Sequence, residues 1–267
     1  MQLFVLLAIL GAALAAPNTS VRIAGGDDTL IRQYPFFTNV QIGGLGVWVQ
    51  HCGGSLLSET VVLTAGSCLD GTIASFLRVK VGASAYNMGT VHNVVNYKYH
   101  ERWNSPTYEN DIGLLFLRTR ATVSNNVGFA RIPGATYTVA DDTTVVAVGF
   151  GDTKPDENSN PDILQSVEIK VINQQTCAQR YAELKDQPNA DPKQPQVTSN
   201  MICTGVLDVE GKGWCYGDEG GPVVAEDNIV VGVASWNHRC GDAKVPGIST
   251  KVSAYSAWII ENAGIPA

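Results

Sequence analysis

Short segments in which apolar and polar residues alternate recur along the 267-residue chain. In residues 77–81 and 167–171, Val, Leu and Ile alternate with charged side chains. Further runs of β-branched residues lie at 61–64, 145–148 and 229–233, and Gly, Asn, Asp or Pro separate the segments. A period of two is typical of antiparallel strands with one buried face. The sequence therefore predicts an all-β barrel or sandwich.

The end of the chain has a different pattern. Apolar residues recur at helical spacing between positions 252 and 259, and Gly264 follows them. Ser253 is of the residue type that caps helix N-termini, and glycine is favoured just after a helix ends. We expect a C-terminal helix that is capped by Ser253 and ends before Gly264.

The first residues are those of a secretory signal. Residues 1–16 are largely apolar, end in small residues and are followed by Pro17. Ala13 and Ala15 have the spacing that a signal peptidase requires, and the run is shorter than the roughly 20 apolar residues of a membrane-spanning helix. We predict a signal peptide at 1–15, cleaved near Ala15 or Ala16, and a secreted, extracellular protein that is not inserted in a membrane.

Charge and cysteine content support this interpretation. The chain has 18 basic and 25 acidic residues, a formal net charge of −7, which disfavours nucleic acid and anionic membranes as partners. Its six cysteines can form three disulfides in an oxidising compartment. The number of cysteines alone leaves several pairings open.

Three motifs carry a family resemblance. They are TAGSC at 64–68, NDIGLLFL at 110–117 and GDEGGP at 217–222, with RIAGG at 22–26 before them and Ser-Trp after them. In this order and spacing they resemble the chymotrypsin-like serine proteases, and the whole chain is similar to insect trypsin-like members. The resemblance runs from residue 23 to the C-terminus. It implies a double antiparallel β-barrel with a C-terminal helix over 23–267, preceded by a short activation propeptide at 16–22.

Two positions depart from the family's catalytic triad. Where the family has a histidine this chain has Ser67, and where it has the nucleophilic serine it has Glu219. Asp111 stands at the aspartate position, with Ser235 at a serine that hydrogen-bonds it. Because a hydroxyl is no general base near neutral pH, we predict an inactive serine-protease-like pseudoenzyme that acts through binding, as a regulator, cofactor or decoy in protease pathways.

An alternative interpretation is that the chain is a trypsin- or chymotrypsin-like serine endopeptidase with residual or relocated catalysis. This interpretation predicts slow, pH-dependent hydrolysis. His51 lies near the expected cleft, but its backbone position does not place the ring between Asp111 and Glu219. A glutamate can attack a carbonyl in some enzymes, although Glu219 has no evident base.

The neighbouring positions resemble an oxyanion hole formed by the backbone N–H groups of Gly217 and Glu219. Two conformations of the Glu219 side chain are open. The carboxylate could fold back and accept those hydrogen bonds, or it could lie at the surface in water.

The primary specificity pocket also departs from the family. Gly213 replaces the acidic floor of trypsin-like members, Trp214 replaces a small wall residue and Asn237 replaces an entrance glycine. We expect a narrowed pocket without a counter-charge for Arg or Lys, unless Trp214 turns outward. The positions assigned to the pocket are Gly213, Trp214, Ser235, Trp236, Asn237 and Gly247.

The resemblance also implies the disulfides and the activation step. The three pairs it implies are Cys52–Cys68, Cys177–Cys203 and Cys215–Cys240. Cleavage after Arg22 would free the amine of Ile23 to pair with Asp218, as the family's activation does.

Two polar stretches, 152–162 and 185–196, are expected to be mobile, solvated loops. We expect no metal and no cofactor, since residues 84–95 lack the acidic side chains of calcium-binding members. The expected partners are proteins, namely proteases, inhibitors or surface ligands, and the chain is expected to be a monomer.

Overall fold

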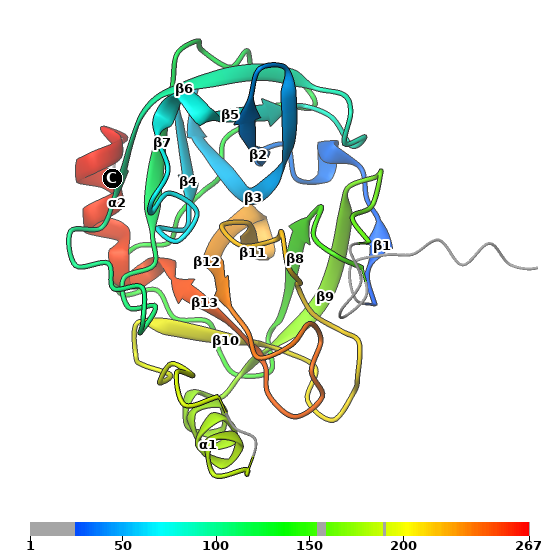
Figure 1. Ribbon diagram of the computed structural model, residues 1–267, viewed down its shortest axis with the longest axis vertical. Coiled ribbons are helices and arrows are strands. Elements are labelled where there is room, and N and C mark those ends of the chain that lie inside the picture. Colours follow the sequence, from blue (N-terminus) through cyan, green and yellow to red (C-terminus); the bar gives the residue numbers. More distant parts are fainter. Residues whose placement is uncertain (1–24, 154–158, 189–190, 267) are drawn as a thin grey trace, which may run out of the picture.

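A computed structural model of the protein describes residues 25–153, 159–188 and 191–266. Its strands form two antiparallel six-stranded barrels, one above the other in Figure 1, which confirms the predicted all-β fold. The N-terminal barrel contains β2 (Phe37–Gly44), β3 (Val47–Ser58), β4 (Val61–Thr64), β5 (Leu77–Val81), β6 (Thr90–Tyr99) and β7 (Gly113–Leu117). Closing a sheet on itself removes its unpaired edges.

The C-terminal barrel is closed by pairing of β8 with β9, and β1 (Asp27–Asp28) extends it along β9. Its strands are β8 (Thr144–Gly149), β9 (Gln165–Ile172), β10 (Met201–Gly205), β11 (Pro222–Ala225), β12 (Ile229–Trp236) and β13 (Gly247–Lys251). On β9 the apolar residues are buried and Glu168 and Lys170 are exposed, so the predicted alternation is confirmed. Val145 pairs with Ile169, and both side chains lie in the barrel core.

The two barrels meet where backbone lies against backbone. The Gly53 N–H on β3 donates a 2.7 Å hydrogen bond to the Glu219 carbonyl before β11. A Cβ atom on Gly53 would lie 2.6 Å from the Gly221 Cα, which is closer than a side chain allows. Glycine at this point therefore brings the segments 64–68 and 217–222 to one interface.

The helices are short. Single 3₁₀ turns occupy η1 (Ile31–Gln33), η2 (Ala74–Phe76), η3 (Glu226–Asn228) and η4 (Val252–Tyr255), and α2 (Ser256–Ala263) follows η4 directly. Gly264 ends α2 in a left-handed conformation, as predicted. The prediction that Ser253 caps this helix is wrong. Ser253 lies within η4, and α2 begins after Tyr255 without a side-chain cap. The chain enters the helix through a 3₁₀ turn, which displaces the N-cap position by two residues, from Ser253 to Tyr255.

Helix α1 (Gln174–Lys185) was not predicted. Its N-cap Asn173 accepts hydrogen bonds from the backbone N–H groups of Gln175 and Thr176. Cys177, Tyr181 and Leu184 are its buried residues, at intervals of four and three. This spacing is a helical signal in the sequence, but it is short and the flanking residues are polar.

The polar stretch 152–162 is less solvated than expected. Asp152 and Thr153 are buried, and both hydrogen-bond Ser159 across the loop. In the second stretch Gln194 is buried as well. The parts of these loops at 154–158 and 189–190 lie outside the described residues. Among the described residues, no helix is long and apolar enough to cross a membrane.

Candidate active site

A cleft with a volume of about 290 Å³ lies between the barrels. The Cys52–Cys68 disulfide forms part of its wall. The other lining side chains are His51, Ser67, Tyr108, Tyr216, Glu219, Ser235, Trp236 and Asn237. Segments that are far apart in sequence thus meet at one surface, and Ser67, Ser235 and Glu219 are among the residues that the motifs singled out.

Asp111 lies just behind this cleft and is fully buried. Its Oδ2 atom accepts hydrogen bonds from the Ser67 hydroxyl, at 3.0 Å, and from the Ser235 hydroxyl, at 2.5 Å. Its Oδ1 atom accepts the Ser67 backbone N–H at 2.6 Å. Burial raises the pKa of Asp111 to about 6, while the hydrogen bonds from Ser235 and Ser67 oppose this rise. A carboxyl with such a pKa changes its charge near neutral pH.

Glu219 folds back against the chain. Its Oε2 atom accepts the Gly217 backbone N–H at 2.6 Å, so the carboxyl group takes up one of the two N–H groups assigned to the oxyanion hole. Burial raises the pKa of Glu219 to about 7, hydrogen bonds from its own and the Gly217 backbone lower it, and the charges of Asp111 and Asp152 raise it. Of the two conformations left open by the sequence, the structure contains the folded-back one.

Asp218 points away from the cleft into the C-terminal barrel. Its carboxylate accepts the N–H groups of Gly151, at 2.7 Å, and Cys215, at 2.9 Å. A Cβ atom on Gly149 would lie 1.9 Å from Asp218 Oδ1, so this carboxyl requires glycine beside it. Burial raises its pKa to about 7. Arg22 and Ile23, its expected partners in activation, lie outside the described residues.

Of the positions assigned to the specificity pocket, Ser235, Trp236 and Asn237 line the cleft, whereas Gly213, Trp214 and Gly247 are not among its lining residues. Trp214 is 2% exposed and packs in the core of the C-terminal barrel with Val223 and Ala234. A Cβ atom on Gly247 would lie 2.6 Å from the Trp214 Nε1 atom. The indole therefore points inward, and with Gly213 beside it there is no carboxylate at this point.

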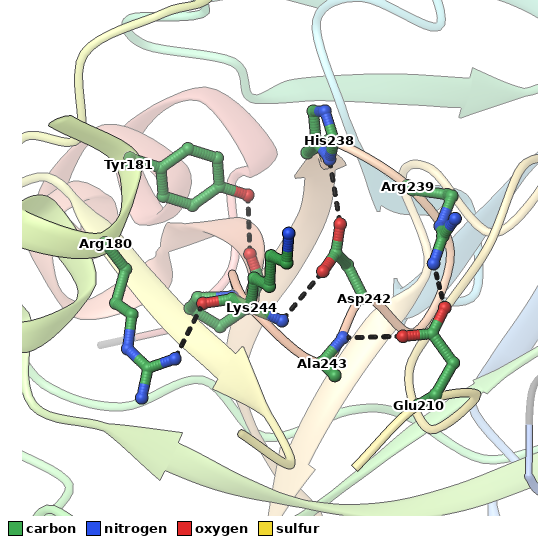
Figure 2. A network of polar contacts seen from close by, with 9 residues as sticks. Arg180, Tyr181, Glu210, His238, Arg239, Asp242, Ala243 and Lys244 are labelled. Atoms are coloured by element: carbon green, nitrogen blue, oxygen red, sulfur yellow. Dashed lines mark hydrogen bonds and ion pairs between the residues drawn. The ribbon is translucent and has the colours of Figure 1, made fainter. Parts of the chain in front are cut away.

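The segment 237–246 continues from the cleft wall and is held in place by the polar network of Figure 2. The His238 imidazole and the Asp242 carboxylate are 2.8 Å apart, and the Tyr181 hydroxyl of α1 donates to the Pro246 carbonyl at 2.6 Å. Helix α1, which the sequence analysis missed, thus positions one side of the site.

Sequence reasoning also missed two aromatic residues of the cleft. Tyr108 lies three residues before Asp111, and Tyr216 directly follows Cys215, so both flank recognised motifs. Their position next to those motifs was the feature of the sequence that could have identified them as cleft residues. His51 does line the cleft, where its Nε2 atom is 2.8 Å from the Cys68 carbonyl oxygen.

The three disulfides pair as the resemblance implies: Cys52–Cys68, Cys177–Cys203 and Cys215–Cys240. Disulfides of this kind persist in oxidising compartments, which fits an extracellular protein. Among the described residues, no group of three or more His, Cys, Asp or Glu side chains could hold a metal ion.

Comparison with known proteins gives consistent matches. A family model described as Trypsin matches residues 23–259. Alkaline trypsin B of Manduca sexta is 37% identical over 98% of this chain and 100% of the relative. Trypsin CFT-1 of Choristoneura fumiferana is 37% identical over 95% of this chain and 96% of the relative, and trypsin alpha of Drosophila melanogaster is 31% identical over 92% and 90%.

These matches contradict the prediction of an inactive binding protein. The relatives are named as trypsins, and the similarity extends over almost the whole chain rather than over single motifs. The prediction gave decisive weight to two positions, Ser67 and Glu219. The findings favour the other reading, a serine endopeptidase.

Proposed function

This chain belongs to the trypsin family, and from that premise we propose that it is a secreted serine endopeptidase with residual or relocated catalysis. Ser67 and Glu219 stand where the family has its histidine and serine. We therefore do not assign catalysis to the family's usual triad. The observation that carries the proposal is the hydrogen-bonded pair of Ser67 and Asp111 in the open cleft.

We assign Ser67 as the nucleophile and Asp111 as its base. The Ser67 hydroxyl lines the cleft and donates to Asp111 Oδ2 at 3.0 Å, which is within reach for proton transfer. Ser235 donates to the same oxygen and positions the carboxylate. With its pKa raised to about 6, Asp111 is a stronger base than an ordinary aspartate and is still ionised at neutral pH.

Glu219 is suited to donate a proton to the leaving amine. Its pKa of about 7 leaves a large fraction of the carboxyl protonated near neutral pH. In the reaction, Ser67 Oγ would attack the peptide carbonyl carbon as its proton passes to Asp111. The C–N bond would then break as the amine takes the proton of Glu219. Water would hydrolyse the Ser67 ester to release the acid, giving one proton to Glu219 while Asp111 returns its proton to Ser67 Oγ.

Turnover by this arrangement should be slow. Carboxylates are weaker bases than imidazole, and the Gly217 N–H is occupied by the Glu219 carboxyl rather than free to stabilise an oxyanion. The residual rate in a trypsin-like scaffold without its complete triad is about 10³- to 10⁴-fold above the uncatalysed reaction. We expect hydrolysis in this range.

Secretion and activation form part of the proposal. The apolar residues 1–15 would be removed as a signal peptide, and residues 16–22 would be released by cleavage between Arg22 and Ile23. The freed ammonium would have a partner in Asp218, because an uncompensated buried carboxylate is costly to ionise. The three disulfides support an extracellular location.

The test is hydrolysis of a broad library of blocked peptides by the purified chain cut at Arg22–Ile23. We expect slow cleavage that falls at least tenfold in Ser67→Ala. Ser75→Ala removes an exposed hydroxyl from η2 and should leave the rate unchanged. A contaminating protease would give the same rate in the native, Ser67→Ala and Ser75→Ala preparations. No cleavage by the native chain would overturn the proposed function, and equal cleavage by Ser67→Ala would overturn the assignment of Ser67.

A further inference from the structure

A buried cation lies between the two barrels without a carboxylate to balance it. Lys80 on β5 is 8% exposed, and its Nζ atom donates a 2.7 Å hydrogen bond to the Tyr86 carbonyl oxygen. Among the described residues, no Asp or Glu forms an ion pair with this ammonium. A buried charge is costly unless an opposite charge or hydrogen bonds offset it. An ammonium has three N–H donors, so two of them lack an acceptor in the part of the chain that the structure describes.

Asn39 on β2 faces the same point. It pairs with Lys80 across the sheet, so the two side chains lie on one face of the N-terminal barrel. Asn39 is 4% exposed, and neither its Oδ1 nor its Nδ2 atom has a hydrogen-bond partner. Two N–H groups of Lys80 and two of the Asn39 amide thus face a single unpaired side-chain oxygen. This excess of donors beside a positive charge is suited to an anion.

The side chains of Asn39 and Lys80 line one small cavity. Its volume is about 10 Å³, which is the space that one water molecule or one small ion occupies. Aromatic rings form part of its wall: Phe37 and Tyr86 come from the N-terminal barrel, and Phe150 comes from the C-terminal barrel. The Phe150 ring centroid lies 5.8 Å from that of Phe37 and 5.7 Å from that of Tyr86. The polar groups of the cavity are therefore enclosed by apolar rings at the interface of the barrels.

A second cation adds to the positive field. Arg78 lies two residues before Lys80, on the same face of β5. It donates to the Gln41 side chain at 2.7 Å, and its guanidinium carbon lies 4.4 Å from the Trp48 ring centroid. No ion pair joins it to a carboxylate of the described residues. Burial lowers the pKa of Lys80, and the Arg78 charge lowers it further. An anion beside Lys80 would oppose both effects.

We propose that this cavity binds one small monovalent anion of the size and charge of chloride. The Lys80 ammonium would supply the counter-charge and one N–H, and the Asn39 amide would turn its Nδ2 atom toward the ion. The Asn39 Oδ1 atom would then accept the remaining N–H of Lys80. The positive charge and the N–H donors select against cations, and the size of the cavity selects against polyatomic anions such as sulfate.

The anion would also help to hold the barrels together. The Ala85 backbone forms a β-bridge with Ile163, and the Tyr86 N–H donates to the Asp162 carbonyl oxygen at 2.8 Å. The segment 82–88 is thus attached to the C-terminal barrel, and the hydrogen bond from Lys80 to Tyr86 attaches it to β5. Occupancy of the cavity should therefore stabilise the folded chain, whether or not the cleft hydrolyses peptides.

The first experiment compares thermal melts of the purified chain in sodium chloride and in sodium gluconate at equal ionic strength, because gluconate is too large for the cavity. We expect chloride to raise the melting temperature by at least about 2 °C relative to gluconate. Sodium bromide should act as chloride does. Equal melting temperatures in chloride and gluconate would overturn the proposal and would indicate that a water molecule fills the cavity.

Two variants locate the anion. Asn39→Asp keeps the size of the side chain and places a carboxylate beside Lys80, so it should abolish the effect of chloride. Asn125→Asp makes the same change at an exposed position and should leave the effect intact. Lys80→Met removes the counter-charge and should also abolish the effect, whereas Lys170→Met, at an exposed lysine of β9, should not. A chloride effect that persists in Asn39→Asp and Lys80→Met would contradict the assignment of the site.

Diffraction from crystals grown in sodium bromide gives the position directly, since bromide scatters anomalously and resembles chloride in charge and size. We expect an anomalous peak between Lys80 Nζ and Asn39 Nδ2. Density without an anomalous signal at this point would identify a water molecule and overturn the proposal. A bromide peak without any shift of the melting temperature in solution would be an adventitious ion only, and it would overturn the proposal as well.

Discussion

The Oε2 atom of Glu219 lies 2.6 Å from the backbone nitrogen of Gly217 and accepts its hydrogen bond. This contact keeps the carboxyl inside the cleft, close enough to Asp111 for the Asp111 charge to raise the pKa of Glu219. A buried carboxyl whose pKa is raised is stabilised in its neutral form. The site therefore changes its charge between about pH 6 and pH 7.

The first prediction concerns stability in Glu219→Gln. The pKa of Glu219 rises from 4.5 in the unfolded chain to about 7 in the folded protein, so the folded state binds more protons between these values. Folding stability contributed by this group is therefore lost as pH rises from about 4.5 to about 7. The variant should be more stable than the native chain at pH 8, by at most about 3 kcal/mol, and equally stable at pH 4.

Thermal melts at the two pH values measure this difference, with Glu261→Gln as the control that should leave the pH dependence unaltered. A lower melting temperature for Glu219→Gln at pH 8 would show that the ionised carboxylate stabilises the fold.

The second prediction is a bell-shaped dependence of hydrolysis on pH. Asp111 must be ionised to act as base, so the rate should rise through about pH 6, and Glu219 must be protonated to act as acid, so it should fall above about pH 7. Because the two carboxyls interact, the apparent values belong to the pair. Asp111→Asn should abolish hydrolysis, and Glu219→Gln should remove the descending limb. A rate that climbs steadily to pH 9 would indicate different groups.

A third prediction concerns Trp214, whose indole fills the space beside Gly247 in the second barrel. Trp214→Ala leaves a cavity and should destabilise the fold by about 3–5 kcal/mol. Trp48→Ala provides the comparison, since Trp48 is half-buried and its ring contacts the Arg78 guanidinium at 4.4 Å. We expect Trp48→Ala to lower the free energy of unfolding by about 1 kcal/mol. Denaturant unfolding of both variants measures the difference, and equal costs would mean that Trp214 is not a core residue.

The fourth prediction concerns the disulfide that joins α1 to β10, Cys177–Cys203, which spans 26 residues. Replacing both cysteines with alanine should lower the unfolding free energy by about 2–4 kcal/mol. The segment 237–246 should also loosen, because Tyr181 of α1 donates to Pro246. Hydrogen exchange at 237–246 reports this loosening, and unchanged protection there would show that the segment is held independently of α1.

The barrels were predictable because a strand with one buried face alternates in sequence, as residues 167–171 do. The alternation at 77–81 predicted a strand correctly, but its Lys80 is buried rather than solvent-facing. The family resemblance of the motifs placed Ser67, Asp111 and Glu219 near one another. In the structure Ser67 and Glu219 line one cleft, and Asp111 is buried directly behind it. Helix α1 was not predicted, because three buried residues among polar ones give a weak periodic signal. The aromatic lining was missed because Tyr108 and Tyr216 meet only through tertiary packing.

The functional prediction failed for a different reason. Replacement of Ser67 and Glu219 argues against the ordinary triad, but single positions do not determine what the remaining groups of a cleft can do. Burial shifts the pKa values of Asp111 and Glu219 toward neutrality, which depends on their surroundings in the folded chain rather than on residue type. Sequence spacing contains no information on that burial.

The most direct measurement is mass spectrometry of the processed chain after reaction with an activated ester at pH 6.5. We predict one acyl group, located on Ser67 and lost slowly to water, and no acyl group on this residue in Asp111→Asn. Release of the alcohol while Ser67 stays unmodified, or no reaction with the ester, would contradict the claim that catalysis has moved to Ser67.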